Sequence, residues 1–209
     1  MNTTIKNSLD KSISYEAYRA LVLNYAQEGK TSGTIQTADY VNYTKLNESR
    51  MHRLDKTMQV IEELKSSIEK IDTEYIWLVI TETWCGDAAQ VIPVINKMAE
   101  LSAKIELRIV LRDENEALMN LFLTNGTKSI PKLIILDKKT GAILGDFGPR
   151  PAGATAFIKN YKSTHGIVDE TAKIELQKWY LGDKGVGIQK EIMALMDKNK
   201  KILTHLINV

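Results

Sequence analysis

The chain has 209 residues, of which 44% are hydrophobic and 26% charged, with a formal net charge of +2 at pH 7. This composition is typical of a folded protein with a hydrophobic core, and it excludes a mostly disordered chain. The single cysteine excludes an internal disulfide framework and a cysteine-rich zinc site.

Basic and acidic residues alternate along the chain, and no long basic run is present, so we expect no nucleic-acid partner. Residues 1–10 lack an apolar segment and are predicted to form a frayed polar tail, not a signal peptide. The longest apolar run, residues 76–80, is too short to cross a bilayer, so we expect no membrane partner. A soluble cytoplasmic protein is the expectation.

The first part of the chain is predicted to be helical. Apolar and aromatic residues recur at helical spacing from about Ser14 until a glycine-containing stretch at 29–33. Thr37 is the expected N-cap of a second helix, and residues 59–71 carry the apolar face of a third. No strand is expected before Glu74.

The pattern then changes to alternating strands and helices. Residues 75–80 form an almost entirely apolar run, which is typical of a strand buried on both faces of a sheet. The further expected elements are a helix at 87–101, a strand at 105–111, a helix at 114–124, hairpin strands at 132–136 and 142–147, and a helix at 152–162. This order predicts an α/β sandwich with a mixed central sheet.

Two more helices are expected in the tail, one through Trp179 and one at about 188–199, separated by a glycine-rich turn at 182–187. We therefore expect an N-terminal helical extension at 1–73 whose last helix packs on the core, an α/β domain at 74–165, and a C-terminal helical extension at 166–209.

The sequence offers no cofactor or metal site. The glycines at 182–187 lack the G-K-[ST] ending of a phosphate-binding loop, and they follow a helix instead of a strand. His52, His165 and His205 are scattered and have no partner at metal-ligand spacing. We therefore expect no cofactor.

The main candidate for chemistry is Cys85, which lies where the first core strand turns into a helix. A thiol there faces free backbone N–H groups and the positive end of the helix dipole, and both favour the thiolate, which is the nucleophile. Trp84 would shield one flank, and Gly86 allows a partner to approach the backbone closely. The alternative is that a lone cysteine packs as a small hydrophobic residue.

A second candidate is the segment Ser129-Ile130-Pro131-Lys132, which directly precedes an apolar strand. Proline cannot donate to a sheet ladder and belongs at the first residue of a strand or at an edge. A cis X-Pro bond here could present the backbone of Ile130 to a neighbouring site. The alternative is a proline that only starts a strand.

Together these residues resemble the thioredoxin pattern: Trp84-Cys85-Gly86, Pro93 eight residues after the cysteine, and Ile130-Pro131 before the hairpin strands. The similarity spans about 74–165, and it is greatest to bacterial thioredoxin-like proteins with W-C-G-D at the turn and extra terminal helices. The resemblance implies a thioredoxin-like three-layer sandwich, with Cys85 as the attacking thiol, Pro131 as the cis-proline beside it, and Pro93 as a helix kink.

The chain departs from this pattern at three positions. Ala88 stands where thioredoxin has its second cysteine, Asp87 replaces the proline, and Val79 replaces the buried acid of the family. In the usual reaction a second thiol resolves the mixed disulfide formed by the first. Because the chain has no second cysteine, it cannot reduce a disulfide without an external thiol.

The expected substrate-binding residues surround Cys85: Trp84, Gly86, Asp87, Ile130, Pro131 and Lys132. Lys132 would favour the thiolate and Asp87 would disfavour it, so the sequence leaves the direction of the pKa shift open. Arg150 is expected to be a solvated loop residue, with contact to an anionic partner as the alternative.

Three functions fit this pattern. The preferred one is monothiol thiol–disulfide exchange through Cys85 with a protein or small thiol or disulfide partner. The second is a redox-inactive module that binds an extended peptide in the groove around Trp84, Ile130 and Pro131. The third is a single-thiol redox sensor. The oligomeric state stays open.

Overall fold

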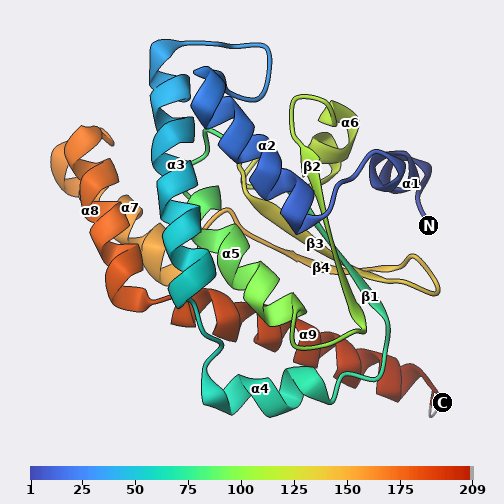
Figure 1. Cartoon of the computed structure of the whole chain (residues 1–209). Coiled ribbons are helices and arrows are strands. Elements are labelled where there is room, and N and C mark those ends of the chain that lie inside the picture. The colour runs from blue at the N-terminus through green and yellow to red at the C-terminus, as the bar shows by residue number, and fades with distance from the viewer. Residues whose placement is uncertain (208–209) are drawn as a thin grey trace.

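The structure is a computed structural model, which describes the backbone of residues 1–207 and the side-chain environment through residue 198. Within that part, helices surround a four-stranded sheet of order β2-β1-β3-β4 (Figure 1). The strands are β1 (Tyr75–Thr81), β2 (Ile105–Leu111), β3 (Lys132–Asp137) and β4 (Ile143–Phe147). The helices are α1 (Thr3–Asp10), α2 (Tyr15–Glu28), α3 (Ala38–Thr57), α4 (Glu62–Glu69), α5 (Ala88–Ala99), α6 (Glu116–Leu121), α7 (Ala152–His165), α8 (Glu170–Asp183) and α9 (Val186–Ile207).

Strand β1 forms the centre of the sheet, and all of its residues are buried. It pairs in parallel with β2, where Val79 lies opposite Ile109, and antiparallel with β3, where Val79 lies opposite Leu133. The hairpin of β3 and β4 completes a mixed sheet. A strand covered on both faces needs apolar side chains on both, which explains why the sequence of β1 does not alternate.

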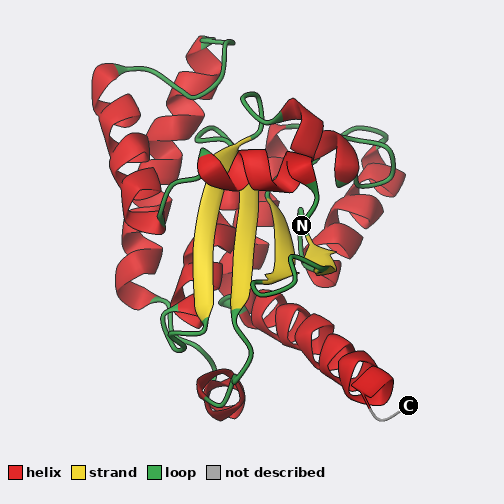
Figure 2. Cartoon of the chain, turned by 90° about the vertical axis from the view of Figure 1, so that its right-hand side faces the viewer, coloured by secondary structure: helices red, strands yellow, loops and turns green. Residues whose placement is uncertain are grey.

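Helices cover both faces of this sheet, as Figure 2 shows. On one side α3 packs against α2 and α5 (Figure 1). Helix α9 contacts α5 and β4, and α8 packs on α7. Helix α5 is buried along nearly its whole length, because it lies between these helices and the sheet. The expected α/β sandwich with a mixed sheet and terminal helices is confirmed.

The beginning of the chain is where the sequence prediction was wrong. Residues 3–10 form helix α1, which Asn2 caps by accepting hydrogen bonds from the N–H groups of Thr4 and Ile5. Ile5 is fully buried in the main core and Leu9, one helical turn later, packs against it, so these two apolar side chains hold an otherwise polar segment in place. Beyond it, Ile13 exchanges two backbone hydrogen bonds of 2.9 Å with Ile109 and covers part of the free edge of β2.

The other element boundaries follow the expectations closely. Thr37 caps α3 by accepting a hydrogen bond from the N–H of Tyr40 at 3.3 Å. The turn between α8 and α9 is narrower than the predicted stretch, because only Lys184 and Gly185 adopt positive φ angles, 54° and 76°. Helix α9 starts at Val186 and is longer than the helix that was expected there.

Residues from α1, α2, α3 and α4 and from α8 and α9 share one hydrophobic cluster with the strands and α5. The division of the chain at residues 74 and 165 therefore stays a prediction. Through residue 207, we find no helix with the length and apolar character that crossing a membrane requires.

Candidate functional site

Cys85 lies in the turn that joins β1 to α5, as expected, but its thiol is buried. The residue is 7% exposed, and its Sγ donates a hydrogen bond of 3.3 Å to the backbone carbonyl of Ile130. The segment before β3 therefore does present its backbone to the cysteine. The Ile130–Pro131 peptide bond is cis.

Burial raises the pKa of the Cys85 thiol to about 12, and the nearby carboxylate of Asp87 adds to the increase. The backbone N–H groups of Ala88 and Asp87 and the guanidinium of Arg150 act in the opposite direction. The effect of desolvation on the pKa is thus larger than the effect of the N–H groups at the helix N-terminus. The direction of the pKa shift of Cys85, which the sequence left open, is upward. The thiol is therefore almost entirely protonated at pH 7.

Asp87 is held in a partly buried ion pair beside the thiol. Its carboxylate lies 2.7 Å from Arg150 Nη2 and accepts a hydrogen bond of 2.9 Å from the hydroxyl of Tyr180 in α8. Burial raises the pKa of the Tyr180 hydroxyl well above its ordinary value, and the charge of Asp87 adds to this. Arg150 is therefore part of the site, and the prediction of a solvated loop residue was wrong.

The loop after β4 brings Arg150 to this position. Gly148 has a φ of 115°, and a Cβ atom there would collide with the carbonyl oxygen of Pro131. Glycine is therefore required for the loop to pass so close to the segment before β3. Within the described chain, Arg150 Nε is buried without a hydrogen-bond partner.

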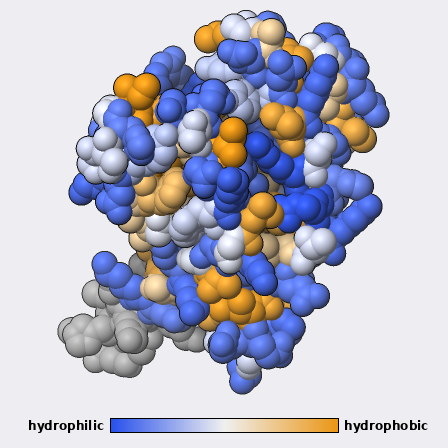
Figure 3. All heavy atoms as spheres, turned by 90° about the vertical axis from the view of Figure 1, so that its left-hand side faces the viewer, coloured by the Kyte–Doolittle hydropathy of each residue, from blue (hydrophilic) through white to orange (hydrophobic). Residues whose placement is uncertain are grey.

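A cavity of about 680 Å³ opens beside the cysteine. Its walls come from α3, from the turn that carries Cys85, from the loops before β3 and after β4, and from α8. Of the expected site residues, five line this cavity: Trp84, Cys85, Gly86, Asp87 and Ile130. It lies toward the side of the molecule shown in Figure 3, where patches of apolar side chains alternate with hydrophilic ones.

Two of the expected substrate-binding residues, Pro131 and Lys132, do not line the cavity. The ammonium of Lys132 is almost fully buried and lies 2.6 Å from the carboxylate of Asp146 on the neighbouring strand. The cation that lowers the pKa of Cys85 is Arg150, so Lys132 does not take the role that its position in the sequence indicated.

Trp84 forms an aromatic wall of the cavity. Its ring stacks on Tyr40 of α3, with ring centroids 4.5 Å apart and an angle of 6° between the planes. The guanidinium of Arg112 lies 5.0 Å from the centroid of the same ring. The shielding of Cys85 by Trp84 stays a prediction, and the tyrosine stacked on the Trp84 ring was not identified from the sequence.

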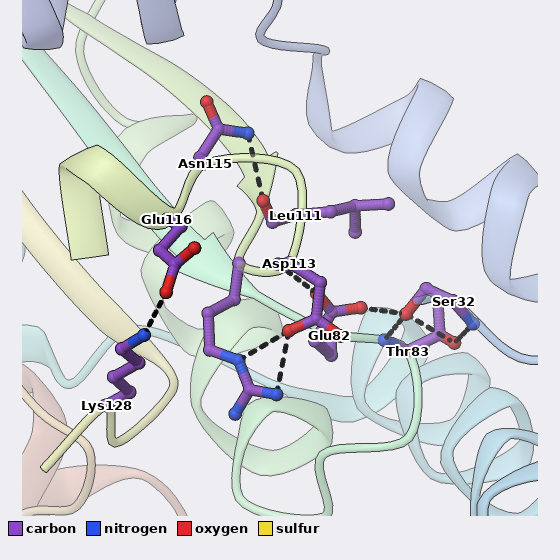
Figure 4. A network of polar contacts seen from close by, with 9 residues as sticks. Ser32, Glu82, Thr83, Leu111, Asp113, Asn115, Glu116 and Lys128 are labelled. Carbon is purple, nitrogen blue, oxygen red and sulfur yellow. Dashed lines mark hydrogen bonds and ion pairs between the residues drawn. The ribbon is translucent and has the colours of Figure 1, made fainter. Parts of the chain in front are cut away.

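A buried polar network holds the residues just before Cys85 (Figure 4). The carboxylate of Glu82 accepts hydrogen bonds from the hydroxyl of Ser32 and from the N–H of Asp113, the second at 2.8 Å. Thr83 N–H donates to Ser32 Oγ at 2.8 Å, and Asn47 Nδ2 donates to the Thr83 carbonyl at 2.9 Å. The α2–α3 loop and α3 therefore position the turn that carries the thiol.

Glu82 is the residue of this network that the sequence analysis missed. It is fully buried, and burial raises the pKa of its carboxyl group, while the hydrogen bonds from Ser32 and Asp113 counteract the increase. The signal in the sequence was an acid directly after an all-apolar strand. The hydrogen-bond donors to Glu82 could not be predicted from neighbouring residues, because Ser32 is far away along the chain.

The described part of the chain contains no cluster of three or more histidine, cysteine, aspartate or glutamate side chains arranged to hold a metal ion. The groups near Cys85 include the carboxylate of Asp87, the guanidinium of Arg150, the hydroxyls of Tyr18 and Tyr180, and backbone N–H groups. Such an arrangement can stabilise charge on a sulfur atom and bind an anion.

Comparisons with known proteins agree on the fold. A family model described as thioredoxin matches residues 33–162. A crystal structure of a protein of unknown function from Pseudomonas aeruginosa superimposes with a TM-score of 0.61, at 16% identity, over 91% of this chain and 95% of that one. An HIV epitope-scaffold superimposes with a TM-score of 0.56, at 16% identity, over 89% of this chain and 99% of that one. Among curated proteins, none matches significantly.

Proposed function

The chain belongs to the thioredoxin family, because the thioredoxin family model matches more than half of it. We propose that the protein performs thiol–disulfide exchange through Cys85 alone. The observation that carries this proposal is the place of the sulfur. It lies at the strand-to-helix turn, on the wall of a cavity, and with two backbone N–H groups beside it.

The reaction has two steps, and each conserves atoms and electrons. Cys85 attacks a disulfide R–S–S–R′, so that a Cys85–S–S–R bond forms, the R–S–S–R′ bond breaks, and R′–S⁻ leaves and takes up the thiol proton. An external thiol R″–SH then attacks the mixed disulfide and gives R–S–S–R″ and free Cys85. A reducing compartment such as the cytoplasm supplies these external thiols.

The local charges predict that this exchange is slow. A thiol with a pKa of about 12 is rarely ionised, and its thiolate is a poor leaving group when an external thiol attacks the mixed disulfide. The N–H groups of Asp87 and Ala88 and the guanidinium of Arg150 stabilise the charge that develops on the sulfur in both steps. We therefore propose a slow exchanger whose mixed disulfide persists.

A peptide joined to 2-mercaptoethanol by a mixed disulfide tests this function. An equimolar amount of the protein is added to this peptide at pH 8, free peptide is measured by chromatography, and the mixed disulfide on the protein is read from the intact mass. The native protein is expected to form the mixed disulfide slowly and to hold it until an excess of mercaptoethanesulfonate removes it, whereas Cys85→Ser should form none. A native protein that forms no mixed disulfide in the folded state, or the same mass change in Cys85→Ser, would rule the function out.

A second candidate is a redox-inactive binding module, and the observation that favours it is the hydrogen bond that holds the buried Cys85 thiol against Ile130. The two functions differ in what they require of the sulfur. A module that binds peptides in the groove retains the same partners in Cys85→Ser, whereas a monothiol exchanger loses every partner held by a mixed disulfide.

A further inference from the structure

The basic side chains that line the cavity differ in their partners. Six of them face it, and five are neutralised by a carboxylate. The pairs are Arg112 with Asp113, Lys128 with Glu116, Arg150 with Asp87, Lys173 with Glu170, and Lys178 with Glu175. The sixth is Arg50 of α3.

Arg50 has no carboxylate partner among the residues that the structure describes. Its Nη1 donates one hydrogen bond of 3.0 Å to the amide oxygen of Asn47 on the same helix. Burial lowers the pKa of its guanidinium, although Tyr43 and, to a smaller extent, the charge of Asp87 counteract part of this. Burying part of a guanidinium without an ion pair is electrostatically unfavourable, so the side chain is suited to bind an anion from outside.

A second donor lies next to Arg50, above the backbone that follows Cys85. A Cβ atom at Gly86 would lie 3.6 Å from Arg50 Nη1 and 3.9 Å from Gln177 Nε2. The amide of Gln177 is oriented by Gln90, whose Nε2 donates to Gln177 Oε1 at 2.7 Å. Its own Nε2 therefore faces Gly86 together with the guanidinium.

Three large apolar side chains also line the cavity wall. Leu46 of α3 and Ile174 and Leu181 of α8 line it, and they are 51%, 57% and 52% exposed. Covering apolar side chains of this size with a ligand removes them from water and stabilises the complex. An occupant is thus expected to carry one anionic group and a short apolar part.

We propose that the cavity binds a disulfide of a small thiol that carries a carboxylate, with the carboxylate on Arg50 and Gln177 and the disulfide at Cys85. This inference rests on the proposed exchange function and names its substrate class. A guanidinium binds a carboxylate through two parallel hydrogen bonds, which fixes the orientation of the substrate as well as its charge. We expect the ligand to carry one anionic group, because Arg50 is the one basic side chain of the described cavity wall without a carboxylate partner. Carboxylates already neutralise the other five basic side chains.

Two symmetric disulfides of similar size separate charge recognition from exchange. Dithiodipropionate carries a carboxylate two carbons from each sulfur, and bis(2-hydroxyethyl) disulfide carries a neutral hydroxyl. The rate of mixed-disulfide formation on Cys85 is read from the intact mass at pH 8. Each rate is divided by the rate of the same probe with 2-mercaptoethanol, so that intrinsic reactivity cancels.

The native protein is expected to favour dithiodipropionate by roughly tenfold, the effect of one charge-assisted hydrogen-bonded pair. Arg50→Gln should remove most of this preference, and Gln177→Leu should reduce it. The matched control is Arg53→Gln, because Arg53 lies on the same helix but does not line this cavity. This control should keep the preference.

The possible outcomes distinguish the two proposals. Equal corrected rates for the two probes, or an equal loss of preference in Arg50→Gln and Arg53→Gln, would overturn the carboxylate site while the exchange function stands. If neither probe modifies Cys85 in the folded protein, the exchange function fails, and the substrate class fails with it.

Discussion

Among single residues, Asp87 has the greatest influence on the chemistry that Cys85 can perform. It stands at the position of the thioredoxin proline, and its charge raises the pKa of the thiol. The same carboxylate is neutralised by Arg150 and receives the Tyr180 hydroxyl. Asp87 therefore adds to the effect of burial, which is the larger cause of the raised pKa of the thiol.

We expect Asp87→Asn to make Cys85 more reactive. The amide removes the negative charge but still accepts the Tyr180 hydroxyl, and it leaves Arg150 free to stabilise the thiolate. Alkylation of Cys85 by iodoacetamide at pH 8 should become several-fold faster. Asp146→Asn is the matched control, since Asp146 pairs with Lys132 outside the cavity. A rate that is unchanged in Asp87→Asn would contradict this role.

The pH dependence of alkylation follows from the raised pKa of Cys85. Because only the thiolate reacts, the rate in the folded protein should increase about tenfold per pH unit from pH 7 to 10. In urea-unfolded protein it should level off near the ordinary pKa of 9.0. A folded-state profile that levels off below pH 9 would show a stabilised thiolate instead.

The same shift has a consequence for stability. Above pH 9.0 the unfolded chain releases the thiol proton, whereas the folded chain retains it up to about pH 12. The unfolded state then binds fewer protons than the folded state, so the free energy of unfolding decreases as the pH rises through this range.

At the scale of elements, the α2–α3 loop is part of the site although it lies far from Cys85 in the sequence. Ser32 bonds to both Glu82 and Thr83, the residues that lead from β1 into the turn (Figure 4). The loop therefore connects the N-terminal helices to the backbone that positions the thiol.

Ser32→Ala is expected to lower the free energy of unfolding by about 2–3 kcal/mol, because it leaves the Glu82 carboxylate and the Thr83 N–H with unmet hydrogen bonds in the interior. Urea denaturation followed by circular dichroism measures this. Ser49→Ala on the exposed face of α3 should change stability by less than about 0.5 kcal/mol. Similar values for the two variants would show that the network does not hold the loop.

The sequence predicted the strands and the thiol turn well, but not the environment of the thiol. The strands and the proline that starts one of them are local signals, but only the resemblance to the thioredoxin pattern implied that Pro131 lies beside Cys85. The contacts of Asp87 with Tyr180 and Arg150 could not be predicted, because the packing of α8 and the β4–α7 loop creates them. Helix α1 was missed because its two apolar contacts with the core, Ile5 and Leu9, are too few to give a periodic pattern.

For the molecule as a whole, the helices outside the predicted core domain complete the site. Helix α3 supplies Tyr40 and Arg50, and α8 supplies Gln177 and Tyr180, so a cavity forms where the sheet and α5 alone would leave a shallow surface. We expect α3 and α8 to determine the selectivity of the site for disulfides, because both helices lie over the turn that carries Cys85.

The central claim, that the buried Cys85 exchanges disulfides in the folded protein, is tested most directly by comparing two rates. One is the rate of mixed-disulfide formation with bis(2-hydroxyethyl) disulfide at pH 8, read from the intact mass, and the other is the rate of global unfolding under the same conditions. We predict that one adduct forms faster than the protein unfolds, that low urea does not accelerate it, and that excess 2-mercaptoethanol removes it. Modification only at the rate of unfolding would contradict the claim, because Cys85 would then be a packed core residue without exchange chemistry.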